Sequence, residues 1–163
     1  MNLKCTKKLL DKLKIKNINN VEDQTSEAIE NWHCNIFDYG KIYGVLITND
    51  KTLFSFYLLG YRTSDFKYFT EIIREDIFKI MVNSGFEQKQ FEIILDSMKN
   101  ITFSKSDNRG VLASMNQMMP YIHNSLEQQE DLTDINVGLN EMINSKLDWK
   151  NPREAFEALL REQ

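Results

Sequence analysis

Three runs rich in aromatic and β-branched residues follow one another closely in the first half of the chain. They cover residues 32–37, 42–48 and 52–59. Residues of these types favour strands, and each run has the length of an ordinary strand. The gaps between the runs hold Asp, Asn and Gly, which suit the turns of hairpins. The sequence therefore predicts an antiparallel sheet in this region.

The segment before these runs begins with a short strand and a helix. Residues 3–5 lean apolar, and Thr6 is placed to cap a helix that ends near Lys14. Residues 17–26 are rich in Asn, Asp, Glu and Gln without a periodic apolar pattern. Such a stretch is typical of a surface loop.

Beyond Gly60 the apolar residues recur at intervals of three and four, as they do in amphipathic helices. Pro120 is expected to bend or end its helix, whereas Pro152 suits a first helical turn. The pattern predicts one further strand, at residues 101–103, and five helices, at residues 64–84, 87–99, 111–126, 133–143 and 152–160.

This order of elements predicts a single α+β domain over residues 1–163. We expect a mainly antiparallel sheet of four to five strands, packed by about six helices in two layers. Of the 163 residues, 42% are hydrophobic and 27% are charged. A chain of this size and composition buries a core of its own without disulfides or metals.

The net charge of −4 and the pI near 5.3 argue against binding to nucleic acid through non-specific charge. The charge is spread unevenly, because residues 1–16 hold six lysines while residues 127–141 hold five acidic residues and no basic one. Either stretch could face a charged partner. Alternatively, the lysines form the solvated side of an amphipathic helix whose leucines face the core.

The expected location is the cytoplasm, without membrane association. No apolar run approaches the length of a membrane span, and the first residues lack the pattern of a signal peptide. The only two cysteines are Cys5 and Cys34, which gives no sign of a disulfide framework.

Signatures of common enzymes are absent, including phosphate-binding loops, dinucleotide fingerprints, hydrolase elbows and zinc-protease helices. A zinc site would need Cys5, Cys34 and His123 to converge from distant segments. His33 and Cys34 are neighbours on a strand, so their side chains point to opposite faces and cannot form a nucleophile pair. We expect core packing for Cys34, no metal and no cofactor.

A polar loop that leads from the last strand into a helix is the best candidate for binding a ligand. Lys105 and Arg109 flank the start of this helix, where free backbone N–H groups would suit a phosphate or a carboxylate. Asn108 is placed to cap the helix, and Ser114 and Asn116 lie on its early turns. The alternative is structural, with a helix cap, an ion pair and a loop contact explaining the same residues.

His33 and Asp50 are the candidates for proton transfer. A histidine titrates near neutral pH, and Asp50 lies at the second hairpin turn beside Lys51, a further candidate for binding a ligand. The alternative for His33 is a half-buried side chain that is hydrogen-bonded to a neighbour. The aromatic strands could also stack single-stranded bases, but they carry few basic residues.

The stretches LKCTKKLL, NDKTLFSF, NRGVLASMN and PREAFEALL are spread over nearly the whole chain. Together with Trp32, His33 and Asn35, they resemble a family of small bacterial proteins described as a domain of unknown function. The resemblance implies membership of the family and brings no activity with it.

Two functions remain open. The first is a non-enzymatic module that binds a protein, or a nucleic-acid-associated partner, as a regulator or inhibitor, in the manner of small domains carried by phages or plasmids. The alternative is a small enzyme for a phosphate-bearing substrate such as RNA or a nucleotide, with Lys105 and Arg109 as anion binders and His33 or Asp50 in proton transfer. The enzyme requires convergence in one pocket of His33, Asp50, Lys51, Arg109 and Asn116.

Overall fold

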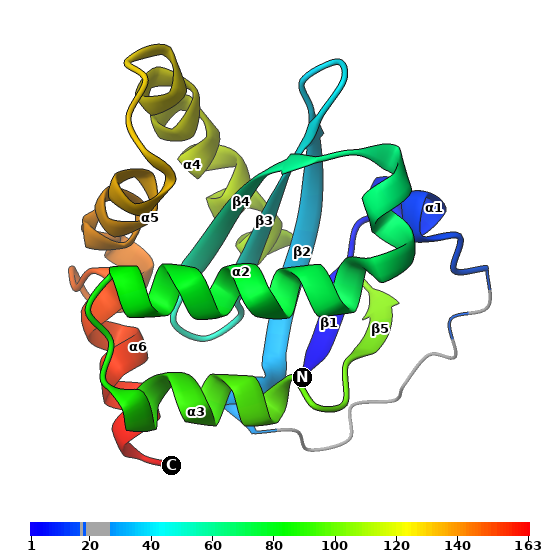
Figure 1. Cartoon of the computed structure of the whole chain (residues 1–163). Helices are drawn as coiled ribbons and strands as arrows, with labels where there is room; N and C mark the ends of the chain where they lie inside the picture. Colours follow the sequence, from blue (N-terminus) through cyan, green and yellow to red (C-terminus); the bar gives the residue numbers. More distant parts are fainter. Residues whose placement is uncertain (17, 19–26) are drawn as a thin grey trace.

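A computed structural model of the chain describes residues 1–16, 18 and 27–163 (Figure 1). Apart from Ile18, the loop expected at residues 17–26 lies outside the described residues. The strands are β1 (Asn2–Cys5), β2 (Asn31–Asp38), β3 (Tyr43–Asn49), β4 (Ser55–Tyr61) and β5 (Thr102–Lys105). The helices are α1 (Lys7–Leu13), α2 (Phe69–Asn83), α3 (Gln88–Ser97), α4 (Arg109–Glu127), α5 (Leu132–Glu141) and α6 (Pro152–Arg161). Short 3-10 turns lie at Ala28–Glu30, Thr63–Tyr68 and Ser145–Leu147.

The five strands form one sheet in the order β4-β3-β2-β1-β5, so the α+β class is confirmed. β2, β3 and β4 pair antiparallel, as the short turns require. β1, however, pairs parallel with both β2 and β5, which makes the sheet mixed rather than purely antiparallel. The reason is the long connections, because each of these pairs is joined through helices that allow a crossover.

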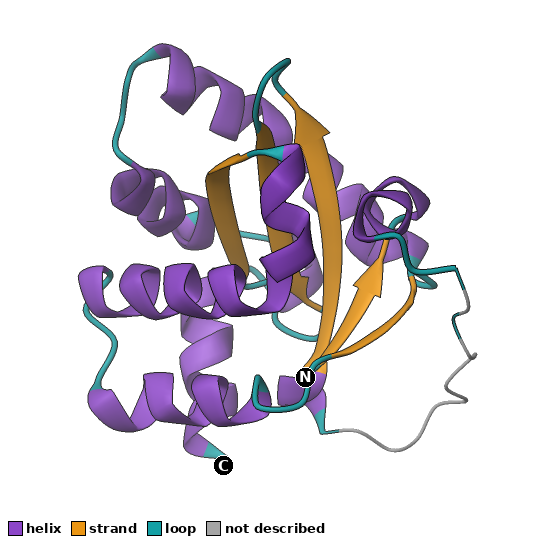
Figure 2. Cartoon of the chain, turned by 45° about the vertical axis from the view of Figure 1, so that its right-hand side comes forward, coloured by secondary structure: helices purple, strands orange, loops and turns teal. Residues whose placement is uncertain are grey.

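Helices lie on both faces of the sheet, where two layers were expected (Figure 2). Trp32, Cys34, Val45, Ile47 and Phe56 face one core cluster, which is completed by residues of α1, α2, α3 and α6. Leu46 and Tyr57, from the alternate positions of β3 and β4, face a second cluster completed by α4 and α5. No described helix is long and apolar enough to span a membrane.

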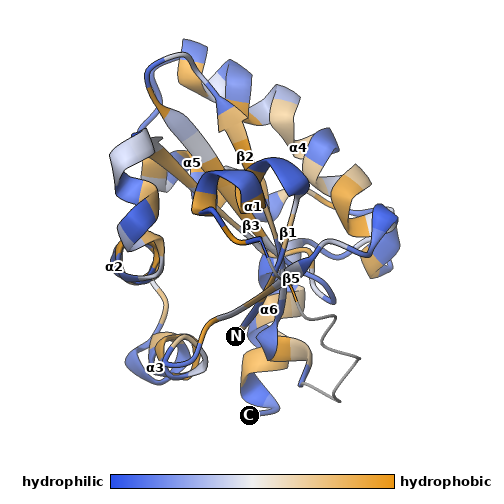
Figure 3. Cartoon of the chain, turned by 90° about the vertical axis from the view of Figure 1, so that its right-hand side faces the viewer, coloured by the Kyte–Doolittle hydropathy of each residue, from blue (hydrophilic) through white to orange (hydrophobic). Residues whose placement is uncertain are grey.

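The helices show the amphipathic pattern that the sequence predicts. In α1, Leu9 and Leu10 are buried while Lys7 and Lys8 are exposed, which supports the solvated-side interpretation of these lysines. Hydrophobic and hydrophilic stretches alternate along α4 and α6 in Figure 3, as expected for helices with one buried side.

Two local expectations differ from the structure. Of the two outcomes expected at Pro120, ending the helix is wrong, because α4 continues through Pro120 to Glu127. Pro120 and Asn116 are both exposed, so the Asn116 carbonyl that loses its backbone donor faces water. Thr6 occupies the N-cap position of α1, but its hydroxyl donates to Asn35 Oδ1 at 2.8 Å instead of capping the helix.

Candidate functional site

A polar row crosses the sheet on the face covered by α4. Strand pairing places Lys4 beside His33, His33 beside Thr48, and Thr48 beside Ser55. His33, Thr48 and Ser55 are completely buried. The alternation of β2 turns Trp32 and Cys34 to the opposite face, so His33 points toward the start of α4.

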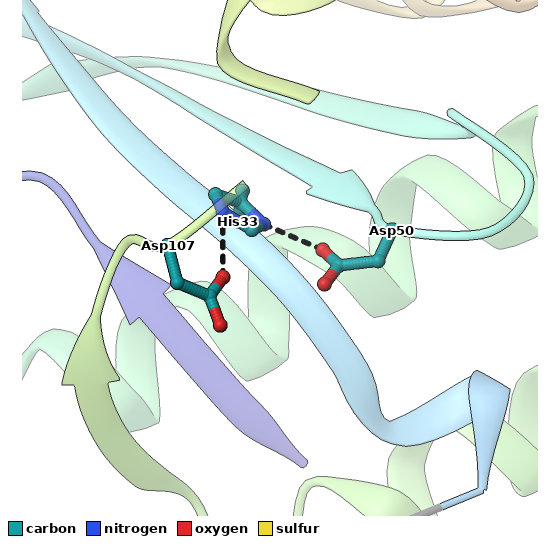
Figure 4. Close-up of side chains that lie close together, drawn as sticks. All are labelled: His33, Asp50 and Asp107. Carbon is teal, nitrogen blue, oxygen red and sulfur yellow. Dashed lines mark hydrogen bonds and ion pairs between the residues drawn. The ribbon is translucent and has the colours of Figure 1, made fainter. Parts of the chain in front are cut away.

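His33 is held from both sides of its ring (Figure 4). Its Nδ1 lies 2.6 Å from Asp50 Oδ1, and the backbone N–H of Asn108 donates to its Nε2 at 3.2 Å. Because Nε2 accepts a hydrogen bond, this arrangement fits a neutral ring that carries its proton on Nδ1 and donates it to Asp50. Asp107 Oδ1 lies 3.5 Å from Nε2.

Lys4 joins the two carboxylates of this cluster. Its ammonium lies 3.1 Å from Asp50 Oδ2 and 3.2 Å from Asp107 Oδ2, and its side chain is 13% exposed. Desolvation lowers the pKa of Lys4, but the two carboxylates together outweigh it and raise the pKa above its usual value. The Lys4 ammonium therefore supplies the positive charge that faces the two carboxylates of the cluster.

His33, Asp50 and Asp107 bring ligand atoms within 4.8 Å of one another, which is close enough for a metal ion. Lys4 already lies between the two carboxylates, and the Asn108 N–H already uses the lone pair of Nε2. A divalent cation would have to displace both donors. The donor set therefore fits a metal poorly.

The start of α4 is closed by its own cap. Asn108 Oδ1 accepts from the N–H groups of Gly110 and Val111, which confirms Asn108 as the cap. The Leu112 N–H bonds to the Asn108 carbonyl. Most of the backbone donors that an anion would use are therefore already engaged.

A family model for a domain of unknown function matches residues 2–155. The chain belongs to the DUF6933 family. This confirms the resemblance seen in the sequence. No curated protein and no solved structure matches the chain.

The structure brings together only part of the residue set singled out in this DUF6933 sequence. His33, Asp50 and Asn108 meet in the cluster, joined by Lys4 and Asp107. Ser114 is buried on α4 and contacts Lys146. Four side chains are exposed and make no recorded polar contact with the cluster within the described part of the chain: Lys51, Lys105, Arg109 and Asn116.

Sequence reasoning missed Lys4 as a member of the cluster. The sequence places Lys4 in the basic amino-terminal stretch, but the residue lies on β1, between two other strands of the sheet. A lysine inside a strand of Leu and Cys was the available signal, because a buried lysine needs carboxylate partners.

Cys5 and Cys34 are paired across β1 and β2 and both lie in the core on the far face from His33. Both are free. Burial, with a contribution from Cys5, raises the pKa of the Cys34 thiol well above its usual value. A neutral buried thiol packs as a small apolar group, which is the role expected for Cys34.

The loop between α5 and α6 (residues 142–151) is the most exposed apolar feature beside α4. Ile143 is 69% exposed and Trp149 is 75% exposed. Asn144 and Lys150 pair as an isolated bridge across the base of the loop. Lys146 Nζ donates to the Gly110 carbonyl at 2.9 Å and contacts Ser114 Oγ at 2.8 Å, so the loop is fixed to the first turns of α4.

Proposed function

We propose that this domain is a non-enzymatic module that binds a protein partner through the α5–α6 loop and the adjoining first turn of α4. The observation that carries the proposal is the exposure of Trp149 and Ile143 on a loop held by hydrogen bonds at both its base and its centre. Most of the Trp149 indole is exposed, so it contributes little to packing among the described residues.

The backbone of the loop supports the proposal that the loop binds a protein partner. Asp148 and Trp149 have φ values of 52° and 64°, in the left-handed region that residues other than glycine seldom adopt. Such a conformation has an energetic cost, and the Trp149 side chain is exposed in it. Tryptophan is enriched among residues that dominate binding energy, and a fixed loop loses little entropy when it binds.

Charges on the segment that leads into α4 and in the loop itself define the expected partner more closely. Arg109, Lys105 and Lys150 are exposed, and the carboxylates in the same segments are Asp107 and Asp148. Asp107 is already paired with Lys4. We therefore expect a partner surface with an apolar pocket for Trp149 and an acidic rim.

The enzymatic alternative, acting on RNA or a nucleotide, has the close His33–Asp50 pair in its favour. Against it, the His33 ring is buried and both of its nitrogens are engaged within the protein. A general base must reach a proton of the substrate. The binding module needs no such rearrangement.

We place this module in the bacterial cytoplasm, where it would act as a regulator or inhibitor. The two free cysteines fit a reducing compartment.

The test is affinity capture from the source cell with tagged full-length protein. Four baits are compared: the unaltered chain, Trp149→Ala, Arg109→Ala and the control Tyr68→Ala, which removes an aromatic ring that is 54% exposed elsewhere. Half of each sample is treated with nuclease. We expect one protein that survives nuclease, is lost with Trp149→Ala, is weakened with Arg109→Ala and is kept with Tyr68→Ala.

A protein retained equally by the Trp149→Ala bait would contradict the proposal. Recovery of RNA or nucleotide that only Arg109→Ala loses would instead favour the enzymatic alternative. Direct binding is then checked with the purified partner by the emission of Trp149, since the other tryptophan, Trp32, is completely buried. Burial of Trp149 should shift its emission to shorter wavelength.

A further inference from the structure

A cavity of about 220 Å³ lies where α2, α5 and α6 meet beside the start of β4. Its apolar wall is made by Phe54, Ile80 and Val137. At about 30 Å³ for each water molecule, the space equals roughly seven waters. The cavity therefore suits a ligand of about ten non-hydrogen atoms or fewer, smaller than a nucleotide or a drug.

Arg153 lines this cavity, and contacts within the protein hold its side chain in place without a ligand. Its guanidinium lies over the ring of Phe86, 3.7 Å from the ring centre, and its Nη1 donates to the Ser84 carbonyl at 3.0 Å. Its Nε bonds to Glu157 at 2.5 Å. These bonds use two of the five N–H donors of an arginine, which leaves three for a ligand.

The positive charge of Arg153 is not cancelled by its partner. Glu157 is shared between Arg153 and Arg161, whose Nη2 lies 3.8 Å from the second carboxylate oxygen. Glu157 therefore divides its two carboxylate oxygens between two arginines, and the Arg153 guanidinium keeps N–H donors without an acceptor among the described residues. A carboxylate on a ligand would meet a pre-positioned guanidinium, which is the group best suited to bind it.

Glu141 lines the same cavity with the opposite charge. Its side chain is exposed and forms no recorded hydrogen bond or ion pair with any described residue. Glu141 is the last residue of α5, at the negative end of that helix, whereas Arg153 lies in the first turn of α6, at a positive end. The two side chains share the cavity without pairing with each other.

The other polar side chains of the wall are already committed to the fold. Asn136 and Asn140 bond to the backbone of Tyr57 and Ser55. Recognition is therefore left to Arg153, Glu141 and the hydroxyl of Ser84.

We propose that this cavity binds a free α-amino acid with an apolar side chain. The ligand carboxylate meets Arg153, its ammonium meets Glu141, and its side chain lies on Phe54, Ile80 and Val137. None of the lining residues belongs to the α5–α6 loop, although Glu141 and Arg153 flank it, and the two proposals are tested with different variants.

The experiment is isothermal titration calorimetry of the full-length protein with L-leucine, L-methionine and L-valine. Two analogues of leucine separate the charges: 3-methylbutylamine lacks the carboxylate, and 4-methylpentanoic acid lacks the ammonium. At least one of the amino acids should bind, and leucine should bind about tenfold or more tightly than either analogue, because each charge-assisted hydrogen bond is worth more than a factor of ten.

Variants assign the binding to the cavity. Glu141→Gln should weaken binding of the amino acid about tenfold or more while leaving the thermal midpoint unchanged. The matched control is Glu130→Gln, an exposed glutamate before α5. Arg153→Lys keeps the charge but loses the planar fork, and should also weaken binding.

Failure of all three amino acids to bind would overturn the proposal. Equal affinity for leucine and 4-methylpentanoic acid, with no effect of Glu141→Gln, would also overturn it, because the ligand would then be a simple carboxylate.

Discussion

At the scale of single residues, His33 connects two separate parts of the fold by hydrogen bonds. Its ring joins the β3–β4 turn, through Asp50, to the start of α4, through the backbone of Asn108. The histidine and aspartate types at these positions suggested proton transfer from sequence alone. Burial could not be read from the sequence, and it is burial that favours the structural role of His33.

Replacing His33 by Phe keeps a ring of similar size but removes both hydrogen bonds. Asp50 Oδ1 and the Asn108 N–H then lose their hydrogen bonds to the ring in a partly buried setting, while Asp50 keeps its ion pair with Lys4. We expect the free energy of unfolding to fall by about 2–4 kcal/mol. The measurement is urea denaturation, with the exposed Lys51→Ala as a control that should change stability by no more than about 0.5 kcal/mol. A fall of less than about 1 kcal/mol in the free energy of unfolding of His33→Phe would contradict this structural role of His33.

Two buried tyrosines should make the stability of the protein fall at alkaline pH. Burial raises the pKa of Tyr61 far above its usual value of 10.0, with a further contribution from Asp76, and burial with the Tyr39 hydrogen bond does the same for Tyr57. Above pH 10 the unfolded chain loses these protons while the folded chain keeps them. The unfolded state therefore binds fewer protons, and stability falls as pH rises. Below pH 10 this contribution is fully present.

Tyr61→Phe should make the fall of stability above pH 10 less steep. The variant also loses the hydrogen bond to Asp76 Oδ2 at 2.8 Å, which lowers stability at every pH where Asp76 is charged, so the slope is the diagnostic quantity. Urea denaturation between pH 8 and 11 measures it. The exposed Tyr68→Phe should leave the slope unchanged, and an unchanged slope for Tyr61→Phe would refute the assignment.

At the scale of elements, α5 closes one edge of the sheet. β4 is an edge strand, and an open edge invites pairing with other chains. Asn136 accepts from the Tyr57 N–H at 2.8 Å and donates to the Tyr57 carbonyl at 2.8 Å. Asn140 makes the same pair of bonds with Ser55, both at 2.7 Å. Two amides four residues apart on a helix thus replace the neighbouring strand.

Asn140→Ala should destabilise the protein by about 2–4 kcal/mol, because the buried N–H and carbonyl of Ser55 both lose their partner. Asn140→Asp keeps the acceptor but removes the donor to the carbonyl, so it should also destabilise. Urea denaturation measures both, with the exposed Asn124→Ala on α4 as the control. Size-exclusion chromatography should show concentration-dependent association of Asn140→Ala. Wild-type stability in that variant would show that the amides are not needed.

Local pattern predicted the elements because apolar periods and turn residues are local properties. The three strands over residues 32–59 and the helices after Gly60 follow from those periods. The parallel pairing of β1 with β2 and β5 could not be predicted, since it depends on contacts between segments up to one hundred residues apart. The same reason hid the meeting of Lys4, His33 and Asp107, which come from three such segments.

At the scale of the whole molecule, the two ends of the chain are built into one structure. β1 lies between β2 and β5, so it joins the hairpin strands to the later part of the chain. Phe156 of α6 is completely buried, stacks on Phe54 at 4.2 Å and meets Trp32 edge-on at 5.7 Å. Residues from both ends therefore share one core cluster. From this sharing, as from length and composition, we predict that residues 1–163 form a single domain.

Such a core should unfold in one cooperative step. In a Trp149→Phe variant, Trp32 is the only tryptophan left, and its fluorescence reports the core that includes α1, α2, α3 and α6. Far-ultraviolet circular dichroism reports all helices, including α4 and α5 on the opposite face. We expect the two urea transitions to coincide, because both core clusters pack against the same strands.

Removing α6 by a stop after Asn151 should abolish the cooperative transition, since Trp32 and Phe54 lose their contact with Phe156. Two separate transitions in the full-length variant would mean that α4 and α5 form an independent unit, and the single-domain prediction would then be wrong.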